Sequence, residues 1–166
     1  CGVAYLLTED VLPDPRPLAL PAVDLVRSPC DSHRVWAFPF GLMFGPESWD
    51  LAEYRRIIDQ LAKLAFTRVS MQFYPEFPHL PLRLGGIERT TADLFLGLHV
   101  PLGPDMVGRE LFDHRRLFWN PDLPLDAPIG ETLAAGQRLV RGVIEHAHAR
   151  GMEFLIGCLP LEYTPE

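Results

Sequence analysis

The stretch WDLAEYRRIIDQLAKLAFTRVSMQFYPE, residues 49–76, decides the fold. Its first half repeats apolar residues every three to four positions, which predicts an amphipathic helix over about 50–65. Asp50 with Glu53 three residues later makes an acidic start that satisfies free backbone N–H groups. Apolar and polar residues then alternate, which predicts a strand over about 67–74. The stretch is therefore half of a βαβ unit.

A second passage from helix to strand follows later in the chain. Apolar spacing predicts a helix over about 131–150, with Gly151 as the glycine that ends it. The run MEFLIGCL, residues 152–159, is almost continuously apolar and predicts a strand buried on both faces of a sheet. An earlier candidate strand covers residues 34–40 and is broken late by Pro39. Repeated α–β units of this kind predict an α/β fold with parallel strands and right-handed crossovers.

Two architectures fit this pattern, an open doubly wound sheet and the first three β/α units of a (β/α)8 barrel. The sequence contains no glycine-rich phosphate or dinucleotide motif after a strand. Instead the strands end in LMFGPESW (42–49), YPEFPH (74–79) and PLEYTPE (160–166). Parallel strands bring these bulky aromatic and polar ends to one edge, which favours the barrel and a site for an uncharged polar substrate.

The remaining segments are less regular. Residues 2–12 have apolar spacing that predicts a short helix, residues 13–21 are proline-rich and predict an extended linker, and residues 22–26 predict a short strand. We therefore expect residues 1–30 to be the tail of a small α/β domain with its linker. Residues 31–166 are then the N-terminal part of the barrel. Because the chain begins with Cys and ends just after a strand, we expect a fragment of a longer chain.

The connection over residues 75–130 is too long for an ordinary loop, so we expect it to be functional or to contain small elements of its own. Short helices are predicted over 91–98 and 106–111. Gly85-Gly86 predicts either an anion-binding nest or a plain turn entering a helix. Trp119-Asn120-Pro121 predicts either a stacking platform or an anchor for the loop.

Composition excludes several classes of function. The net charge of −7 and the absence of a basic run argue against a nucleic-acid partner. No apolar run reaches the length of a membrane span. The three cysteines lack metal-ligand spacing, and His146 and His148 lie two apart on a helix and face different directions, so no metal and no cofactor is expected. The oligomeric state and the compartment, secreted, periplasmic or cytoplasmic, stay open.

A set of residues in the first part of the chain resembles the junction before the catalytic barrel of family-20 hexosaminidases and related α-glucuronidases. In order, they are Gly2, Tyr5, Leu20-Pro21, Asp24, Pro29 and Arg34. The helix and strand of residues 49–76 and the segment IEHAHARGMEFLIG, residues 144–157, are similar to the early units of such barrels. The chain departs from the pattern at Leu6 and Val35, where glycines are expected. The resemblance implies a carbohydrate-active hydrolase whose principal acid follows a fourth strand, beyond Glu166.

Glycoside cleavage uses two carboxyl groups, or one with assistance from the substrate. The strand ends offer acids, aromatic rings and imidazoles that suit sugar binding better than cleavage. The expected substrate-binding residues are Arg34, Tyr74, Glu76, His79, Glu162 and Tyr163, and the catalytic residue stays unknown. The predicted function is hydrolysis of glycosidic bonds with a carbohydrate substrate. The alternatives are a non-catalytic carbohydrate- or partner-binding barrel and a small flavodoxin-like domain.

Overall fold

The computed structural model describes the secondary structure of most of the chain between residues 4 and 158. The described residues are 4–6, 10–14, 22, 24–26, 28, 30–38, 46–73, 82–84, 86–89, 100–107, 109–112 and 115–158. Their centre is a parallel three-stranded sheet with the order β3-β4-β7. Its strands are β3 (Val35–Phe38), β4 (Arg68–Phe73) and β7 (Glu153–Cys158). The three strands predicted from the sequence are therefore confirmed.

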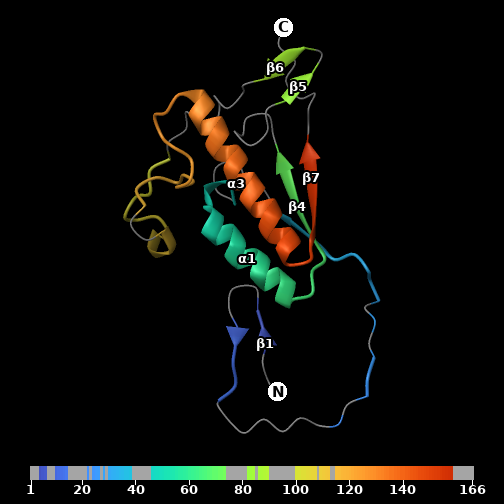
Figure 1. Cartoon of the computed structure of the whole chain (residues 1–166). Coiled ribbons are helices and arrows are strands. Elements are labelled where there is room, and N and C mark those ends of the chain that lie inside the picture. The colour runs from blue at the N-terminus through green and yellow to red at the C-terminus, as the bar shows by residue number, and fades with distance from the viewer. Residues whose placement is uncertain are drawn as a thin grey trace.

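Two helices cover the same face of this sheet (Figure 1). Helix α1 (Leu51–Lys63) connects β3 to β4, and helix α3 (Ile129–Ala149) lies in the connection from β4 to β7. In Figure 1, β4 and β7 point the same way, β7 lies to the right, and α3 lies in front, so this crossover is right-handed as expected. The α/β class and the parallel sheet are thus established.

Local sequence explains where α1 begins and ends. Asp50 is its N-cap and accepts a hydrogen bond from the backbone N–H of Glu53, while the Glu53 side chain accepts one from the N–H of Asp50. This reciprocal pair is a capping box. At the other end, Ala65 has a positive φ of 61°, and the N–H of Phe66 donates to the carbonyl of Leu61. The predicted helix is confirmed, together with its acidic start.

Helix α3 is also confirmed, and it begins two residues earlier than predicted. Pro128 occupies its N-cap position, where the missing N–H of proline costs nothing. Gly151 follows the helix with a φ of 74°, the left-handed conformation that glycine adopts without strain. This turn leads directly into β7.

The core lies between the two helices and the sheet. Its fully buried side chains come from α1, β4 and α3 and interlock in one cluster. They include Tyr54, Ile58, Leu61, Val69, Met71, Val143 and Ala147, each with 0% exposure. The helices also approach each other closely at Gly142, where an added Cβ would lie 2.8 Å from Cδ2 of Leu51.

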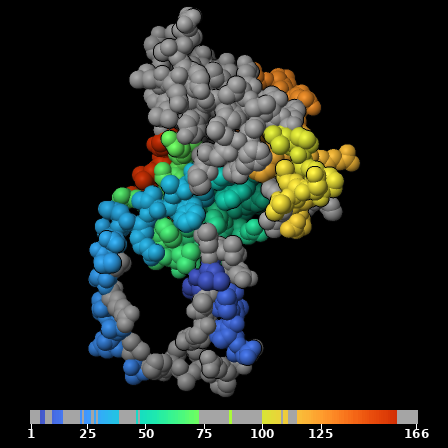
Figure 2. Space-filling model, turned by 180° about the vertical axis from the view of Figure 1, so that it is seen from behind, coloured from blue at the N-terminus to red at the C-terminus, as the bar shows by residue number. Residues whose placement is uncertain are grey.

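The other face of the sheet carries no helix in the described part of the chain. Figure 2 views the molecule from this side. Val35 is 43% exposed and Leu155 is 38% exposed on this face. The prediction that the last strand is buried on both faces is therefore wrong. The strand itself is confirmed, but the described helices lie on one face only, and Ile156, which pairs in register with the buried Met71 on that face, is still 48% exposed.

The N-terminal segment differs from its prediction. The described positions within residues 2–12 do not form the predicted helix, because β1 (Ala4–Tyr5) and β2 (Asp10–Val11) pair as antiparallel strands. The ammonium group of Lys63 lies 2.5 Å from Asp10 Oδ2 and 5.8 Å from the ring centroid of Tyr5. These tertiary contacts outweigh the local apolar period. Within residues 22–26, the described positions form no strand.

The long connection contains small elements, as expected, but different ones. β5 (Leu82–Leu84) and β6 (Ile87–Arg89) form an antiparallel hairpin. Its turn contains Gly86 with a φ of 83°, and Gly86 is followed by a strand and not by the predicted helix. The 3-10 helix η2 (Arg109–Phe112) also lies in this connection, whereas η1 (Pro46–Ser48) lies between β3 and α1. η2 replaces the helix predicted over 106–111, and the helix predicted over 91–98 lies outside the described residues.

Candidate functional site

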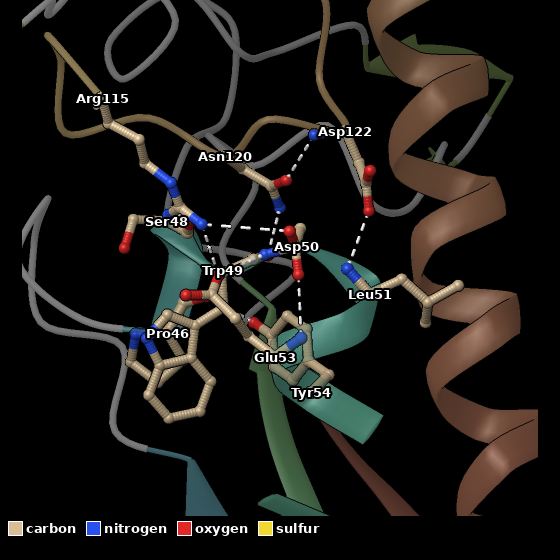
Figure 3. Close-up of polar contacts among 10 residues, drawn as sticks. All are labelled: Pro46, Ser48, Trp49, Asp50, Leu51, Glu53, Tyr54, Arg115, Asn120 and Asp122. Atoms are coloured by element: carbon tan, nitrogen blue, oxygen red, sulfur yellow. Dashed lines mark hydrogen bonds and ion pairs between the residues drawn. The ribbon is translucent and has the colours of Figure 1, made fainter. Parts of the chain in front are cut away.

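The later part of the long connection is attached to the start of α1 through Arg115 (Figure 3). The guanidinium group donates to the carbonyl of Ser48 at 3.2 Å and to Glu53 Oε2 at 3.0 Å. It also lies 3.9 Å from Asp50 Oδ2. These side chains are each about a quarter to a third exposed, so solvent screens the charges only in part. Arg115 therefore joins the loop, η1 and α1.

A second attachment is made by Asn120, which is only 2% exposed. Its side-chain amide donates to the carbonyl of Trp49 at 2.6 Å, and its Oδ1 accepts from the N–H of Asp122 at 2.8 Å. Asp122 Oδ2 in turn accepts from the N–H of Leu51 at 2.7 Å. Each buried polar atom in this chain of contacts has a partner, as a stable polar network requires.

These contacts use the groups that a helix start normally offers to a ligand. The N–H groups of Asp50, Leu51 and Glu53 are all bound by carboxylate oxygens of the protein. A helix N-terminus with its N–H groups free can bind an anion, but here carboxylates already occupy them. The start of α1 is therefore an anchor for the loop and not an anion site.

Aromatic packing fixes the same end of the sheet. The rings of Phe38, Trp49 and Tyr54 make mutual edge-to-face contacts, with centroid distances of 5.5–6.1 Å. The hydroxyl of Tyr54 donates to the carbonyl of Pro46 at 2.7 Å. Because Phe38 ends β3, these contacts fix the passage from the carboxyl end of β3 into α1.

Arg34, the one predicted site residue that the structure describes, lies at the opposite end of the sheet. It precedes β3, and its guanidinium group donates to the carbonyl of Leu64 at 2.9 Å and lies 4.9 Å from the ring centroid of Phe66. Its backbone N–H donates to the hydroxyl of Thr67. These contacts join the start of β3 to the turn after α1. The other predicted substrate-binding residues, Tyr74, Glu76, His79, Glu162 and Tyr163, lie outside the described residues.

Sequence reasoning found part of the anchor and missed the rest. Of the two interpretations of Trp119-Asn120-Pro121, the loop anchor is confirmed, because the indole N–H of Trp119 donates to the carbonyl of Leu123 and Asn120 bonds to Trp49. Arg115 and Asp122 were missed. Their partners are more than 60 residues away in the sequence, and the only available signal was an acidic helix start able to attract a distant arginine.

A further polar cluster joins the two helices. His146 Nε2 and Arg150 Nε each lie 2.7 Å from Asp59 Oδ1. Burial alone would raise the pKa of Asp59, but the hydrogen bonds and charges of Arg150 and His146 outweigh burial and lower this pKa below its ordinary value. With Asp59 ionised, His146 donates through a protonated Nε2. His148 is exposed. Among the described residues, no group of three or more His, Cys, Asp or Glu is placed to hold a metal ion.

Comparisons with protein-family models, with curated proteins and with solved structures find no match. In the described part of the chain, no helix combines the length and the apolar composition that crossing a membrane requires.

Proposed function

We propose that this chain forms the first three β/α units of a (β/α)8 barrel that binds and hydrolyses carbohydrate at the carboxyl edge of its strands. One observation carries the proposal: the strands follow one another in the order β3-β4-β7, with α1 and α3 on the same face. In a barrel each new strand pairs with the one before it, and the helices form an outer layer. In this proposal, the sheet face opposite the two helices corresponds to the barrel interior.

The strand order also separates this proposal from two open-sheet folds. A flavodoxin-like sheet has its first strand between the second and third, whereas here the second strand, β4, lies in the middle. The first half of a dinucleotide-binding fold has the same order as this sheet, but it requires a glycine-rich turn after its first strand. Residues 39–48, which follow β3, contain no such motif.

The substrate class rests on the strand ends and on the resemblance to family-20 enzymes. Barrel enzymes place their active sites at the carboxyl edge. The fixed passage from β3 into α1 and the anchored loop provide a rigid support there, which favours precise positioning of a substrate. In this proposal, Tyr74, Glu76 and His79 follow β4 and Glu162 and Tyr163 follow β7, and together they line the substrate cleft.

A non-catalytic carbohydrate-binding barrel is the second candidate, and a specific observation favours it. The carboxylates at the start of α1, Asp50, Glu53 and Asp122, are all occupied with backbone N–H groups or Arg115. A general acid or base must be free to exchange a proton with the substrate. These three residues therefore serve structure, and none of them is free to act in cleavage.

The test is to measure glycan binding and product release by the full-length gene product. A panel of aryl glycosides and neutral oligosaccharides is used, first with the wild type and then with Tyr74→Ala. If Tyr74 stacks on a sugar ring, the substitution weakens affinity by about 1–3 kcal/mol, in line with aromatic contacts of that kind. Tyr5→Ala is the matched control, because Tyr5 is an exposed tyrosine on β1, beside Lys63.

Three outcomes separate the candidates. Release of sugar supports the hydrolase. Binding without release supports the non-catalytic barrel. Absence of both binding and release contradicts both candidates, and equal affinities for wild type and Tyr74→Ala remove that residue from the site.

A further inference from the structure

The face of β4 opposite the helices is polar, although β4 is the central strand of the described sheet. Residues Arg68, Ser70 and Gln72 alternate with the buried Val69 and Met71 and so lie on the face opposite the helices. Central strands of parallel sheets are usually apolar on both faces because both are packed. A polar face on the central strand therefore suits contact with water or with a polar ligand better than packing against an apolar layer.

The charges on this face lie at its amino end and neutralise each other. Arg68 pairs in register with Glu153 on β7, and Arg68 Nε lies 2.6 Å from Glu153 Oε2. Toward the carboxyl end, the polar residues of β4 on this face are Ser70 and Gln72, which carry no charge. The carboxyl end of β4 therefore suits a neutral polar ligand, since an ionic ligand would find no counter-charge on this strand.

Among the described residues of β4, Gln72 is the polar side chain of this face nearest the carboxyl edge. It is exposed, and its amide makes no hydrogen bond with any residue that the structure describes. Its register partner on β7 is Gly157. A Cβ added at Gly157 would lie 3.6 Å from Cγ of Gln72, an ordinary van der Waals distance, so the two residues are close neighbours and Gly157 adds no side chain of its own beside Gln72.

We propose that Gln72 binds the hydroxyl groups of a neutral carbohydrate that lies across Gly157. This proposal rests on the proposed function and adds a binding residue to the same carboxyl edge. A primary amide both donates and accepts hydrogen bonds, which matches hydroxyl groups that do the same. Leu155, 38% exposed on the same face of β7, offers apolar surface to the C–H groups of the sugar.

The test compares the wild type, Gln72→Ala and Gly157→Leu in the full-length gene product. A microarray of neutral oligosaccharides identifies the best-bound sugar, and titration calorimetry with that sugar gives the affinities. Gln72→Ala should weaken binding about three- to tenfold, the equivalent of one or two hydrogen bonds. Gly157→Leu should weaken binding at least as much by filling the space beside Gln72. Gln137→Ala, which removes an exposed glutamine from α3, should bind like the wild type.

The outcomes distinguish the two proposals. Unchanged affinity in both Gln72→Ala and Gly157→Leu, with sugar binding by the wild type intact, overturns the role of Gln72 and leaves the proposed function standing. Failure of the wild type to bind any sugar on the array overturns the proposed function and the carbohydrate ligand of Gln72 together. Unchanged melting temperature in Gln72→Ala establishes that a loss of affinity comes from the missing amide, because an exposed side chain contributes little to folding.

Discussion

At the scale of single residues, the polar cluster between α1 and α3 is centred on one carboxylate oxygen. Asp59 Oδ1 accepts from both His146 and Arg150, and the side chain of Asp59 is 35% exposed. Charge-assisted hydrogen bonds are stronger than neutral ones, but exposure to solvent reduces their contribution. The cluster therefore adds a modest polar contact at the edge of an apolar interface.

Replacing Asp59 by Asn should lower the free energy of unfolding by about 1 kcal/mol at pH 7, because the ionised acceptor is lost. The pKa of Asp59 is lowered in the folded state, so its contribution is fully present above the ordinary value of 3.8. The contribution is lost as the pH falls below 3.8 through the lowered pKa. Urea denaturation at pH 7 and at pH 3 measures both effects.

Glu145→Gln is the control for the Asp59 substitution, because Glu145 is an exposed acid on α3. It should leave the free energy of unfolding within about 0.5 kcal/mol of the wild type. An Asp59→Asn variant as stable as the wild type at pH 7 would show that the shared carboxylate contributes nothing.

At the scale of elements, α1 has two different functions along its length. Its start carries the capping box and holds the distant loop through Arg115 and Asp122. Its buried side, with Ile58 and Leu61, packs in the core. The start thus fixes the geometry of the carboxyl edge, and the apolar side fixes the helix to the sheet.

Substituting Arg115 by Ala should loosen the loop, although Asn120 and Asp122 still hold it to the start of α1. The variant loses hydrogen bonds to Ser48 and Glu53, and we expect a loss of about 1–2 kcal/mol of stability from these partly exposed contacts. Hydrogen–deuterium exchange should show faster exchange at the backbone N–H groups of residues 116–123, with β4 and β7 unchanged.

Arg116→Ala is the matched control for Arg115, because the neighbouring Arg116 is exposed. Its backbone carbonyl, which accepts from the N–H of Leu102, stays in place after the substitution. Exchange in the loop that is equally fast in both variants would contradict a specific role for Arg115.

At the scale of the whole molecule, the described residues form one layer of helices on one face of a parallel sheet. The layer holds together where Gly142 of α3 meets Leu51 of α1. The side chain of Leu51 lies against the backbone of α3 at this point, because Gly142 adds no side chain of its own there. This close approach lets both helices cover the same sheet face.

Gly142→Leu should separate the two helices and destabilise the protein by about 1–2 kcal/mol, since overpacking outweighs the better helix propensity of leucine. Combining it with Leu51→Ala makes room for the new side chain. The double variant should therefore be more stable than the sum of the single effects predicts, by about 0.5 kcal/mol or more in a thermodynamic cycle.

Gly130→Leu tests whether the effect is specific to the helix contact. Gly130 lies at the start of the same helix, and an added Cβ would meet nothing within 4 Å. This control should not be destabilised. Strict additivity of Gly142→Leu and Leu51→Ala would contradict the close contact between the helices.

Local sequence predicted the main elements because their signals are local. The apolar period and the Asp50–Glu53 pair specify α1, and Gly151 marks the end of α3. The apolar spacing of residues 2–12 gave a wrong prediction because the segment follows its contacts with Lys63. The hairpin of β5 and β6 was also missed, since only its glycine pair marked it.

The sequence by itself determined the α/β class, the three parallel strands and the two helices, because apolar periodicity and helix ends are properties of neighbouring residues. Only the tertiary structure decided that both helices lie on one face, that Arg115 and Asp122 hold the start of α1, and that Arg34 bonds to the turn after α1. These contacts join residues about 30 to 70 positions apart. Long-range pairing leaves no period in the sequence, because it depends on how the packed elements place their side chains.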